Sequence, residues 1–277
     1  MTLLEKMSKH VSMEIDEHNS RIKLMKYPKT SLEALVKHLE ELADQKELGK
    51  VMIYADPDDL DTFQELGFEH EGEISGFFDG EPAMILSRFI DENRAVSKDE
   101  EKKDRIVELA ERKLEIEEPP QLDPAFTLRQ ATLSDVEELA DLYNQVFETY
   151  PTPMHDPSFV REYMENDVYF SVITYQGKII SAASADVFTK YNCAEITDCA
   201  TKPEFRGKGL LSVIIYDLEK KMKEQEIYNL FSLTRAVSTG MNIVISKLGF
   251  EYQGRLIQNS HIAGQFEDMN IWVKQIG

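Results

Sequence analysis

The stretch Thr201-Lys-Pro-Glu-Phe-Arg206-Gly-Lys-Gly209-Leu-Leu-Ser decides the fold of this chain. It follows a strand-like segment at 194–200 and opens a helical pattern that runs from about Leu210 to Glu224. The first turn of a helix has backbone N–H groups without partners and the positive end of the helix dipole. Glycines at 207 and 209 let a phosphate approach that backbone, and Arg206 and Lys208 add positive charge. The stretch therefore predicts a site for a phosphate-bearing cofactor.

The composition limits the partners of the chain. At 277 residues it is long enough for one large or two modest domains. The formal net charge of −20 argues against nucleic acid, which needs clustered basic residues, and is compatible with a small cationic substrate. The excess of acidic residues is equally compatible with a role in keeping the protein soluble. A homodimer is compatible with the sequence, which gives no sign of the oligomeric state.

Cysteines, histidines and apolar runs indicate the compartment. No apolar run reaches the ~18 residues of a membrane span, and the N-terminus lacks a signal-peptide core. Cys193 and Cys199 are too far apart along one strand pattern to form a disulfide. The histidines lack the spacing of metal ligands. We therefore expect a cytoplasmic protein with no metal and no membrane partner.

Strand and helix patterns alternate in the C-terminal part of the chain. Ser134 is the expected N-cap of an amphipathic helix, and Gly249 is expected to end a later one. The predicted strands lie at 126–130, 168–175, 178–188, 194–200, 229–235, 250–257 and 269–274. The predicted helices lie near 134–147, 157–165, 210–224 and 239–248. This order predicts an α/β (α+β) domain with a mixed central sheet.

The N-terminal part resembles a second copy of half of this pattern. Leu66-Gly-Phe-Glu-His-Glu-Gly72 repeats Leu248-Gly-Phe-Glu-Tyr-Gln-Gly254, and a hairpin is expected at 11–16 and 21–26. Between the two parts, a mixed-charge run and a helical pattern near 97–114 are followed by Pro119-Pro120. We predict an N-terminal unit at 1–92 without its own phosphate loop, a solvated, charged helical linker at 93–122, and a C-terminal domain at 123–277.

The loop and the element order resemble the GNAT N-acetyltransferase superfamily over about residues 124–277. The spacing Arg206-x-x-Gly209 matches the acetyl-CoA pyrophosphate loop [RQ]-x-x-G-x-[GA] of that family, except that Leu211 replaces Gly or Ala. There is no G-x-x-x-x-G-K-[ST] or G-x-G-x-x-G motif for other nucleotide folds. The resemblance implies acetyl-CoA as cosubstrate and a GNAT fold preceded by a smaller, partial GNAT-like unit. The cofactor-binding residues that it implies are Cys199, Ala200, Thr201, Arg206, Gly207, Lys208, Gly209, Leu210 and Asn242.

Further residues are similar to one branch, the β-lysine N6-acetyltransferases. They lie in both parts of the chain and include Asn19-Ser-Arg21, Glu71-Gly72, Glu195-Ile-Thr-Asp198, Gly240-Met-Asn242, Gly254-Arg-Leu-Ile257 and Phe266-Glu-Asp-Met-Asn270. This similarity implies acetylation of the N6 amine of L-β-lysine, which yields a compatible solute. The alternatives are a polyamine or protein-lysine acetyltransferase, and a non-catalytic acyl-CoA-binding regulator.

Acetyl transfer needs a base, because an alkyl ammonium has a pKa of about 10.4 and is almost fully protonated at neutral pH. Glu195 lies where several GNAT enzymes carry a glutamate base, and Asp198 is its rival. In an unbroken strand the two would point to opposite faces. A nucleophilic role for Cys199 is rejected, because no base is set beside it.

The proton donor and the substrate contacts are less defined by the sequence. Ile245 replaces the tyrosine that many relatives carry, which leaves Ser246, Tyr252 or water to protonate the leaving thiolate. Arg235 is the expected clamp for the substrate carboxylate, and Asp268 or Glu267 would hold an ammonium group. Asn259 and His261 are candidate polar groups of the pocket.

Overall fold

The computed structural model describes residues 11–277 except 114, 117 and 119. Its strands form one twelve-stranded sheet in the order β1-β2-β3-β5-β4-β11-β12-β10-β9-β8-β7-β6. The strands are β1 (Ser12–Asp16), β2 (Arg21–Lys26), β3 (Lys50–Ala55), β4 (Glu69–Phe78), β5 (Glu81–Phe89), β6 (Phe126–Gln130), β7 (Val168–Tyr175), β8 (Lys178–Phe188), β9 (Cys193–Thr201), β10 (Asn229–Arg235), β11 (Glu251–Ile262) and β12 (Gln265–Gln275). The helices are α2 (Leu32–Gln45), α3 (Leu60–Glu65), α4 (Glu100–Glu111), α5 (Val136–Val146), α6 (Pro157–Glu165), α7 (Leu210–Glu224) and α8 (Thr239–Lys247).

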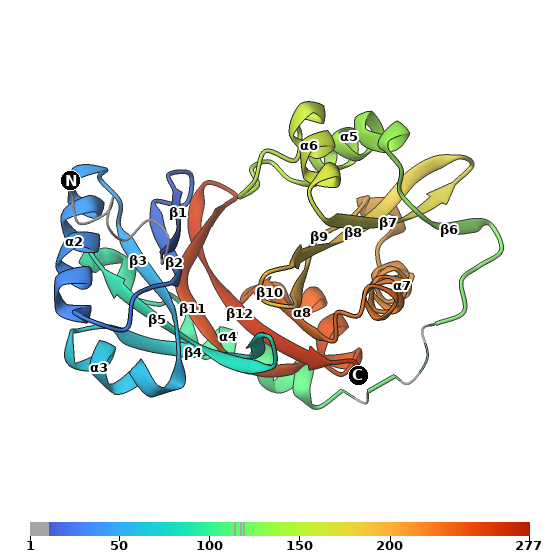
Figure 1. The fold of residues 1–277 in the computed structure, drawn as a ribbon. Coiled ribbons are helices and arrows are strands. Elements are labelled where there is room, and N and C mark those ends of the chain that lie inside the picture. The colour runs from blue at the N-terminus through green and yellow to red at the C-terminus, as the bar shows by residue number, and fades with distance from the viewer. Residues whose placement is uncertain (1–10, 114, 117, 119) are drawn as a thin grey trace.

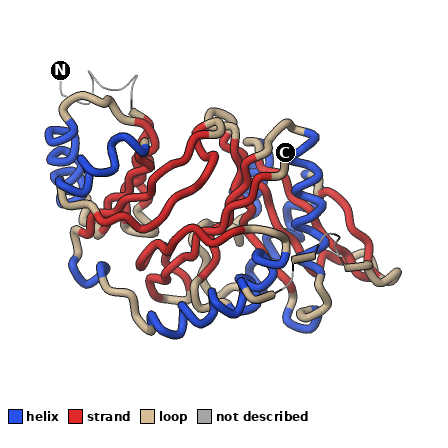
Figure 2. Tube along the Cα trace, turned by 90° about the horizontal axis from the view of Figure 1, so that it is seen from below, coloured by secondary structure: helices blue, strands red, loops and turns tan. Residues whose placement is uncertain are grey.

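Strands β11 and β12 run through the middle of the molecule, between the N-terminal strands and β7–β10 (Figure 1). Figure 2 shows the same arrangement from below, with helices on the outside of the sheet. Helices α5 and α6 pack on one face of β7–β9 and α7 packs on the other, each with its own hydrophobic cluster. None of the helices that the structure describes is both long and apolar enough to cross a membrane.

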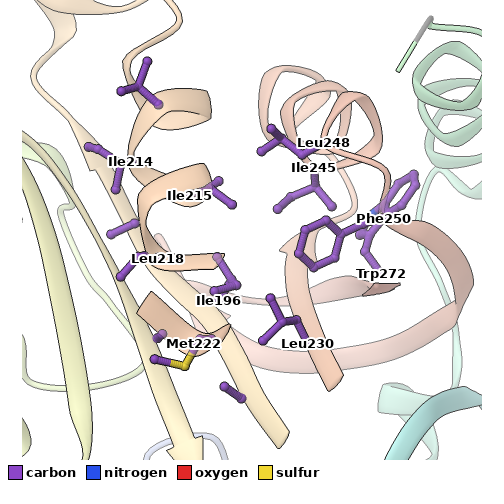
Figure 3. Close-up of a cluster of buried hydrophobic side chains, with 14 of the residues drawn as sticks. Ile196, Ile214, Ile215, Leu218, Met222, Leu230, Ile245, Leu248, Phe250 and Trp272 are labelled. Carbon is purple, nitrogen blue, oxygen red and sulfur yellow. The ribbon is translucent and has the colours of Figure 1, made fainter. Parts of the chain in front are cut away.

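The largest cluster lies between α7, α8 and the sheet. Five of its residues are almost fully buried: in Figure 3, Ile215 of α7 points toward Ile245 and Leu248 of the α8 segment, whereas Ile214 and Leu218 point to the opposite side of α7. Their spacing is the helical one that the sequence shows from Leu210 onward. This packing fixes the start of α7 against the end of β9, where the glycine-bearing loop lies.

Two local details differ from the sequence-based expectation. The helix at α5 is preceded by a 3-10 turn (Leu133–Asp135) whose capping box is made by Thr132 and Asp135, and not by Ser134. The linker helix α4 is not simply solvated, because Lys103, Ile106, Val107 and Ala110 are buried. Ser246 of α8 donates to the carbonyl of Ala110 at 3.0 Å. One face of α4 is therefore buried, and the many charged residues of the segment made this face hard to recognise in the sequence.

The predicted internal repeat has a counterpart in the sheet. The N-terminal series β1-β2-α2-β3-α3-β4-β5 matches the later series β8-β9-α7-β10-α8-β11-β12 in element type and order. In both, the first two strands form an antiparallel pair, and the second strand is parallel to the third. The sheet order β3-β5-β4 is followed by its mirror image β11-β12-β10. The two halves are therefore related by an approximate two-fold axis at the β4–β11 junction.

The loop that corresponds to the glycine-bearing stretch is different in the N-terminal half. The residue before α2 is Ser31, with φ 63°, just as Gly209 with φ 73° precedes α7. Near it, the Lys29 ammonium lies 2.6 Å from the Asp56 carboxylate, and Tyr27 donates to Asp59 at 2.9 Å. These acidic partners would repel a phosphate, which agrees with a single cofactor site in the C-terminal half.

Candidate active site

Strands β9 and β10 separate and open a cavity. They are paired in parallel only from Asn229–Cys193 to Phe231–Glu195, although both continue for several residues. A cavity of about 770 Å³ extends from this point to the glycine-bearing loop. Its walls come from both strands, from α8 and from β12.

The glycine-bearing loop forms one end of the cavity. Gly207 and Gly209 have φ values of 76° and 73°, a conformation that other residues adopt at a cost. Within the part of the chain that the structure describes, no side chain caps the first turn of α7, which leaves its amides available to an anion. Arg206 and Lys208 are exposed, and the Arg206 Nε donates to the carbonyl of Thr201 at 3.2 Å. The loop thus fits the pyrophosphate of coenzyme A.

Most of the predicted cofactor residues line the cavity. They are Cys199, Thr201, Arg206, Gly207, Lys208, Gly209 and Leu210.

Asn242 and Ala200 are placed differently. Asn242 is fully buried; its Nδ2 donates to the carbonyls of Arg235 at 3.0 Å and Ser238 at 2.8 Å. Its Oδ1 accepts from Thr234, Asn270 and Trp272. All its polar atoms are engaged, so the predicted cofactor contact of this side chain is wrong. Ala200 is buried among residues of the α5–α6 cluster. Ser238, Gly240, Met241 and Val244 line the cavity from the α8 side instead.

A β-bulge places both acidic candidates on one face of β9. Thr197 pairs with Ser184 and Ala200 with Ala182, so Asp198 and Cys199 together oppose a single residue, and Asp198 has φ 50°. Asp198 Oδ2 accepts from Ser184 at 2.6 Å. Glu195 pairs with Asp186, which lies two residues after Ser184 on the same face. The expectation that Glu195 and Asp198 point to opposite faces is therefore wrong.

Asp198 has the environment of a general base. It lines the cavity, and only 4% of its surface is exposed. Burial raises the pKa of Asp198 to about 6, against the effect of the hydrogen bond from Ser184. The group is therefore mostly ionised at neutral pH and yet more basic than an ordinary aspartate. Glu195 is half-buried, and burial followed by the charge of Asp186 raises its pKa well above the usual range.

Aromatic residues of α5 and of the segment after it lie near Asp198 and the cavity. Phe147 and Tyr150 line the cavity, and the Tyr143 hydroxyl donates to the carbonyl of Asp198 at 2.6 Å. Burial raises the pKa of the Tyr143 and Tyr150 hydroxyls, so both stay protonated. Tyr150 was missed from the sequence, because it follows the end of the helical pattern of α5, where only the dense aromatic composition of 147–150 marks it.

The proton donors considered from the sequence lie elsewhere. Ser246 is bonded to α4, as described above, and Tyr252 packs edge-on against Trp272 with ring centroids 5.6 Å apart. Neither lines the cavity. Ile245 is fully buried in the core. Cys199 does line the cavity, but burial raises the pKa of its thiol, which disfavours the thiolate that a nucleophile needs.

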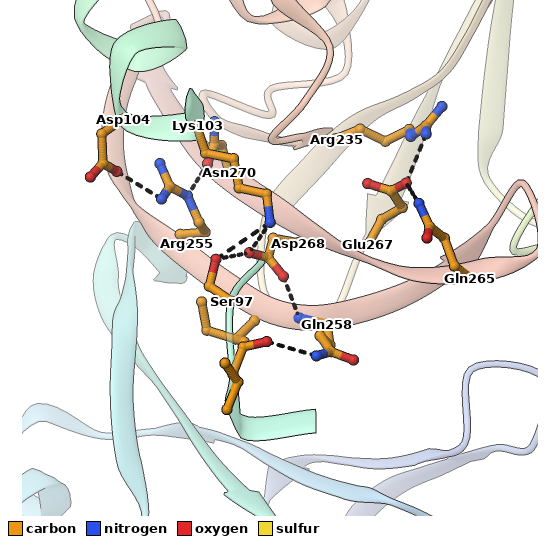
Figure 4. Close-up of polar contacts among 12 residues, drawn as sticks. Ser97, Lys103, Asp104, Arg235, Arg255, Gln258, Gln265, Glu267, Asp268 and Asn270 are labelled. Carbon is orange, nitrogen blue, oxygen red and sulfur yellow. Dashed lines mark hydrogen bonds and ion pairs between the residues drawn. The ribbon is translucent and has the colours of Figure 1, made fainter. Parts of the chain in front are cut away.

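Arg235 is the predicted substrate residue that reaches the cavity. Its guanidinium donates to Glu267 Oε1 at 3.0 Å, and Gln265 donates to the same oxygen at 2.9 Å (Figure 4). Glu267 is buried and serves as the anchor of Arg235. The Nε of Arg235 is buried and finds no partner among the described residues. Glu267 thus holds the Arg235 side chain in place without engaging all of the N–H groups of its guanidinium.

The other predicted substrate residues do not line the cavity. Asp268 is 2% exposed; it forms an ion pair with Lys103 at 2.7 Å and accepts from the backbone of Gln258 at 2.8 Å (Figure 4). Asn259 and His261 meet the tip of the β1–β2 hairpin. There the Asn259 carbonyl accepts from Arg21 at 2.9 Å, and the His261 amide donates to Asn19 at 2.8 Å. All three residues hold the two halves and the linker helix together, and their predicted role in binding substrate is not supported.

Comparison with known proteins agrees with this geometry. Residues 136–250 match the model of the Acetyltransferase (GNAT) family. The chain is 35% identical to "N-acetyltransferase YodP" of Bacillus subtilis, with 95% of both chains covered. It is 32% identical to the "Beta-lysine N(6)-acetyltransferase" of Methanococcus maripaludis over 95% of both chains, and 35% identical to that of Methanosarcina mazei over 86% of this chain and 95% of the relative.

The chain belongs to the GNAT acetyltransferase family. Its fold class is that of the family, a mixed α/β sheet with helices on both faces. It is therefore an N-acetyltransferase, and its similarity to the β-lysine enzymes includes the N-terminal half. Among the described residues, no group of His, Cys, Asp and Glu is arranged to hold a metal ion.

Proposed function

We propose that this chain transfers the acetyl group of acetyl-CoA to the N6 amine of L-β-lysine. The observation that carries the proposal is a single cavity that joins the anion-binding loop, the separated strands and Asp198. Relatives that share the length of the chain and both halves are named β-lysine N(6)-acetyltransferases, which supports this acceptor. The product would bear one carboxylate and one ammonium group and so be zwitterionic, as suits a compatible solute.

The loop and the strand edges would hold the cofactor, which supplies an acetyl thioester. The free amides at the start of α7 bind the pyrophosphate, assisted by Arg206 and Lys208. Backbone N–H groups of β9 beyond Glu195 have lost their β10 partners and face the cavity. Such amides bind the pantetheine arm and stabilise negative charge on a thioester oxygen.

Asp198 and Tyr150 would move the protons. The Asp198 carboxylate accepts a proton from the N6 ammonium, directly or through one water, which frees the amine lone pair for attack on the thioester carbonyl. The new N–C bond forms as the C–S bond breaks, and the second proton of the amine nitrogen passes to the departing sulfur, so that coenzyme A leaves as the free thiol. The Tyr150 hydroxyl, on the same wall of the cavity, donates a hydrogen bond to the departing sulfur. The proton taken up by Asp198 then returns to solvent.

Arg235 would bind the carboxylate of the amino acid. Its position on the cavity wall, with the Glu267 contact holding one end of the guanidinium, suits a charged contact with a carboxylate. A polyamine has no carboxylate, and a protein lysine has none near its amine. This cation is therefore better suited to a free amino acid than to either alternative acceptor.

An acceptor panel tests the proposal. Purified protein is mixed with acetyl-CoA and L-β-lysine, L-lysine, spermidine or a lysine peptide, and release of the free thiol is followed. We expect the highest kcat/KM with L-β-lysine. A higher value with spermidine or the peptide would reassign the acceptor. Coenzyme A binding in calorimetry without turnover of any amine would identify a non-catalytic acyl-CoA-binding protein.

A further inference from the structure

Lys23 and Glu195 occupy equivalent positions in the two related halves. Gly72 pairs with Ile85, and its repeat partner Gly254 pairs with Ile271, so these two isoleucines correspond. Two residues further along β5 and β12, Ser87 pairs with Met52 and Val273 with Phe231. Met52 pairs in turn with Lys23, and Phe231 pairs with Glu195, so Lys23 of β2 corresponds to Glu195 of β9.

The strands next to these two residues correspond as well. Glu14 of β1 pairs with Lys23, and Asp186 of β8 pairs with Glu195, so Glu14 is the counterpart of Asp186.

The two pairs face one another across the approximate two-fold axis. Met25, two residues after Lys23 on the same face, packs in one hydrophobic cluster with Cys193, two residues before Glu195. The Tyr191 hydroxyl of the β8–β9 turn lies 3.4 Å from the carbonyl of Met25. The charge of Lys23 acts on both Glu195 and Asp186. We call Glu14, Lys23, Asp186 and Glu195 the charge quartet.

The charge quartet holds more negative than positive charge. Asp186 and Glu195 are directly opposite on neighbouring strands, where Cβ atoms are about 5 Å apart and like charges are unfavourable. The one ammonium group of the quartet, on Lys23, lies 3.2 Å from Glu14 Oε2 and is engaged there. Asp186 accepts one neutral hydrogen bond, from the Tyr163 hydroxyl at 3.0 Å. The Asp186–Glu195 pair is thus short of a cation.

This pair lies beside residues of the active-site cavity, although neither Asp186 nor Glu195 is itself among the residues that line it. Thr197 and Asp198, which line the cavity, lie on the same face of β9 as Glu195. An acceptor whose reacting amine is at Asp198 therefore has its remaining chain within reach of Glu195. With Asp268 bound to Lys103 and Glu267 bound to Arg235, the carboxylates first considered for an ammonium group are already engaged.

We infer that the Asp186–Glu195 pair binds the second ammonium group of the acceptor, and that Glu14 of the N-terminal half enables this by holding Lys23 away from Glu195. The inference rests on the proposed function. In L-β-lysine this group is the 3-ammonium, which a short alkyl chain separates from the reacting amine. Glu195 then determines specificity, while Asp198 acts as the base. The N-terminal half would contribute to the acceptor site through Glu14 and Lys23.

A pair of acceptors isolates this contact. L-β-lysine and 6-aminohexanoate both have the carboxylate and the 6-amine, and only L-β-lysine has the 3-ammonium. We expect the wild type to prefer L-β-lysine in kcat/KM by roughly tenfold to hundredfold, as for one charged hydrogen bond. Glu195→Gln should reduce the preference to within about threefold, mainly through a higher KM for L-β-lysine. Glu14→Gln should reduce it as well, because Lys23 is then free to pair with Glu195.

The matched control is Glu251→Gln, at an exposed glutamate at the start of β11, which should keep the wild-type preference. If Glu195→Gln lowers kcat equally for both acceptors and keeps the preference, Glu195 is the base and the inference is overturned. Equal use of both acceptors by the wild type overturns it too, while acetylation of L-β-lysine stands. Turnover of neither acceptor refutes the proposed function itself. If Glu195→Gln does not fold, Asp186→Asn is expected to have the same effect on the preference.

Discussion

Gly72 of β4 and Gly254 of β11 are paired with each other at the junction of the two halves. Each is the last residue of one copy of the seven-residue repeat, Leu66–Gly72 or Leu248–Gly254, so the approximate two-fold axis passes between equivalent glycines. A Cβ atom on Gly254 would lie 2.5 Å from the Cα of Gly72 and 2.4 Å from the carbonyl oxygen of Glu71. The close approach of two backbones at this point requires glycine on both sides.

Gly254→Ala should therefore destabilise the protein. The φ of 140° is one that alanine rarely adopts, and the contacts are with backbone that cannot move aside. We expect a loss of about 2–4 kcal/mol in the free energy of unfolding by denaturant. Gly264→Ala is the control, since it also has a positive φ but no atom within 4 Å of the added Cβ. A loss no larger than that of the control would show that the junction tolerates separation.

Gly209→Val tests the cofactor loop. The substitution places a branched side chain at φ 73°, at the point where the loop meets α7, and within reach of Pro120. We expect the KM for acetyl-CoA to rise by roughly tenfold or more, with a much smaller change in the KM for the amine. An unchanged KM for acetyl-CoA would place the pyrophosphate elsewhere.

Arg235→Met tests the carboxylate clamp. We expect kcat/KM for L-β-lysine to fall by roughly tenfold to hundredfold, because a charged contact is lost. Pentane-1,4-diamine, which is β-lysine without its carboxylate, should lose little. Arg105→Met, at an exposed residue of α4, serves as control. Equal losses with both acceptors would mean that Arg235 positions the cofactor or the strand and not the carboxylate.

Asp198→Asn should stabilise the protein at neutral pH while it impairs the chemistry. The pKa of Asp198 is raised from 3.8 to about 6, so the folded state holds a proton more tightly than the unfolded state. The protonated Asp198 carboxyl makes its full contribution to the free energy of unfolding below about pH 4. This contribution is lost as the pH rises through 6, which lowers the free energy of unfolding by up to about 3 kcal/mol. Removal of this penalty should raise Tm at pH 7 more than at pH 4. The exposed Asp141→Asn should show no such difference, and a variant that is equally destabilised at both pH values would contradict the assigned environment.

The sequence predicted most elements of the C-terminal half and the place of the loop. The glycines at 207 and 209 and the helical spacing after Leu210 are local signals, and local signals are what a sequence shows best. The repeat of Leu66–Gly72 and Leu248–Gly254 was detectable because both glycines serve one contact. The extension of the repeat to α2 and the β1–β2 hairpin has no such sequence signal.

The arrangement of the site depended on features without a sequence signature. Nothing in Thr197-Asp-Cys199 marks a bulge, yet the bulge decides which way Asp198 points. Asn242 and Asp268 look like functional polar residues, and their partners come from segments far apart in the chain, Trp272 and Lys103. Glu14 and Lys23 become relevant only when the sheet brings the two halves together. Long-range packing, and not local propensity, placed these side chains.

The most direct test is the pH dependence of kcat/KM for L-β-lysine, measured by thiol release with the wild type and Asp198→Asn. The account predicts that wild-type activity falls as the pH drops through about 6, where Asp198 becomes protonated. Asp198→Asn should be slower by about 10²–10⁴-fold at pH 7 and should recover part of that loss at high pH, where more of the amine is free. A variant with wild-type activity and the wild-type pH profile, or a wild type that does not acetylate L-β-lysine, would contradict it.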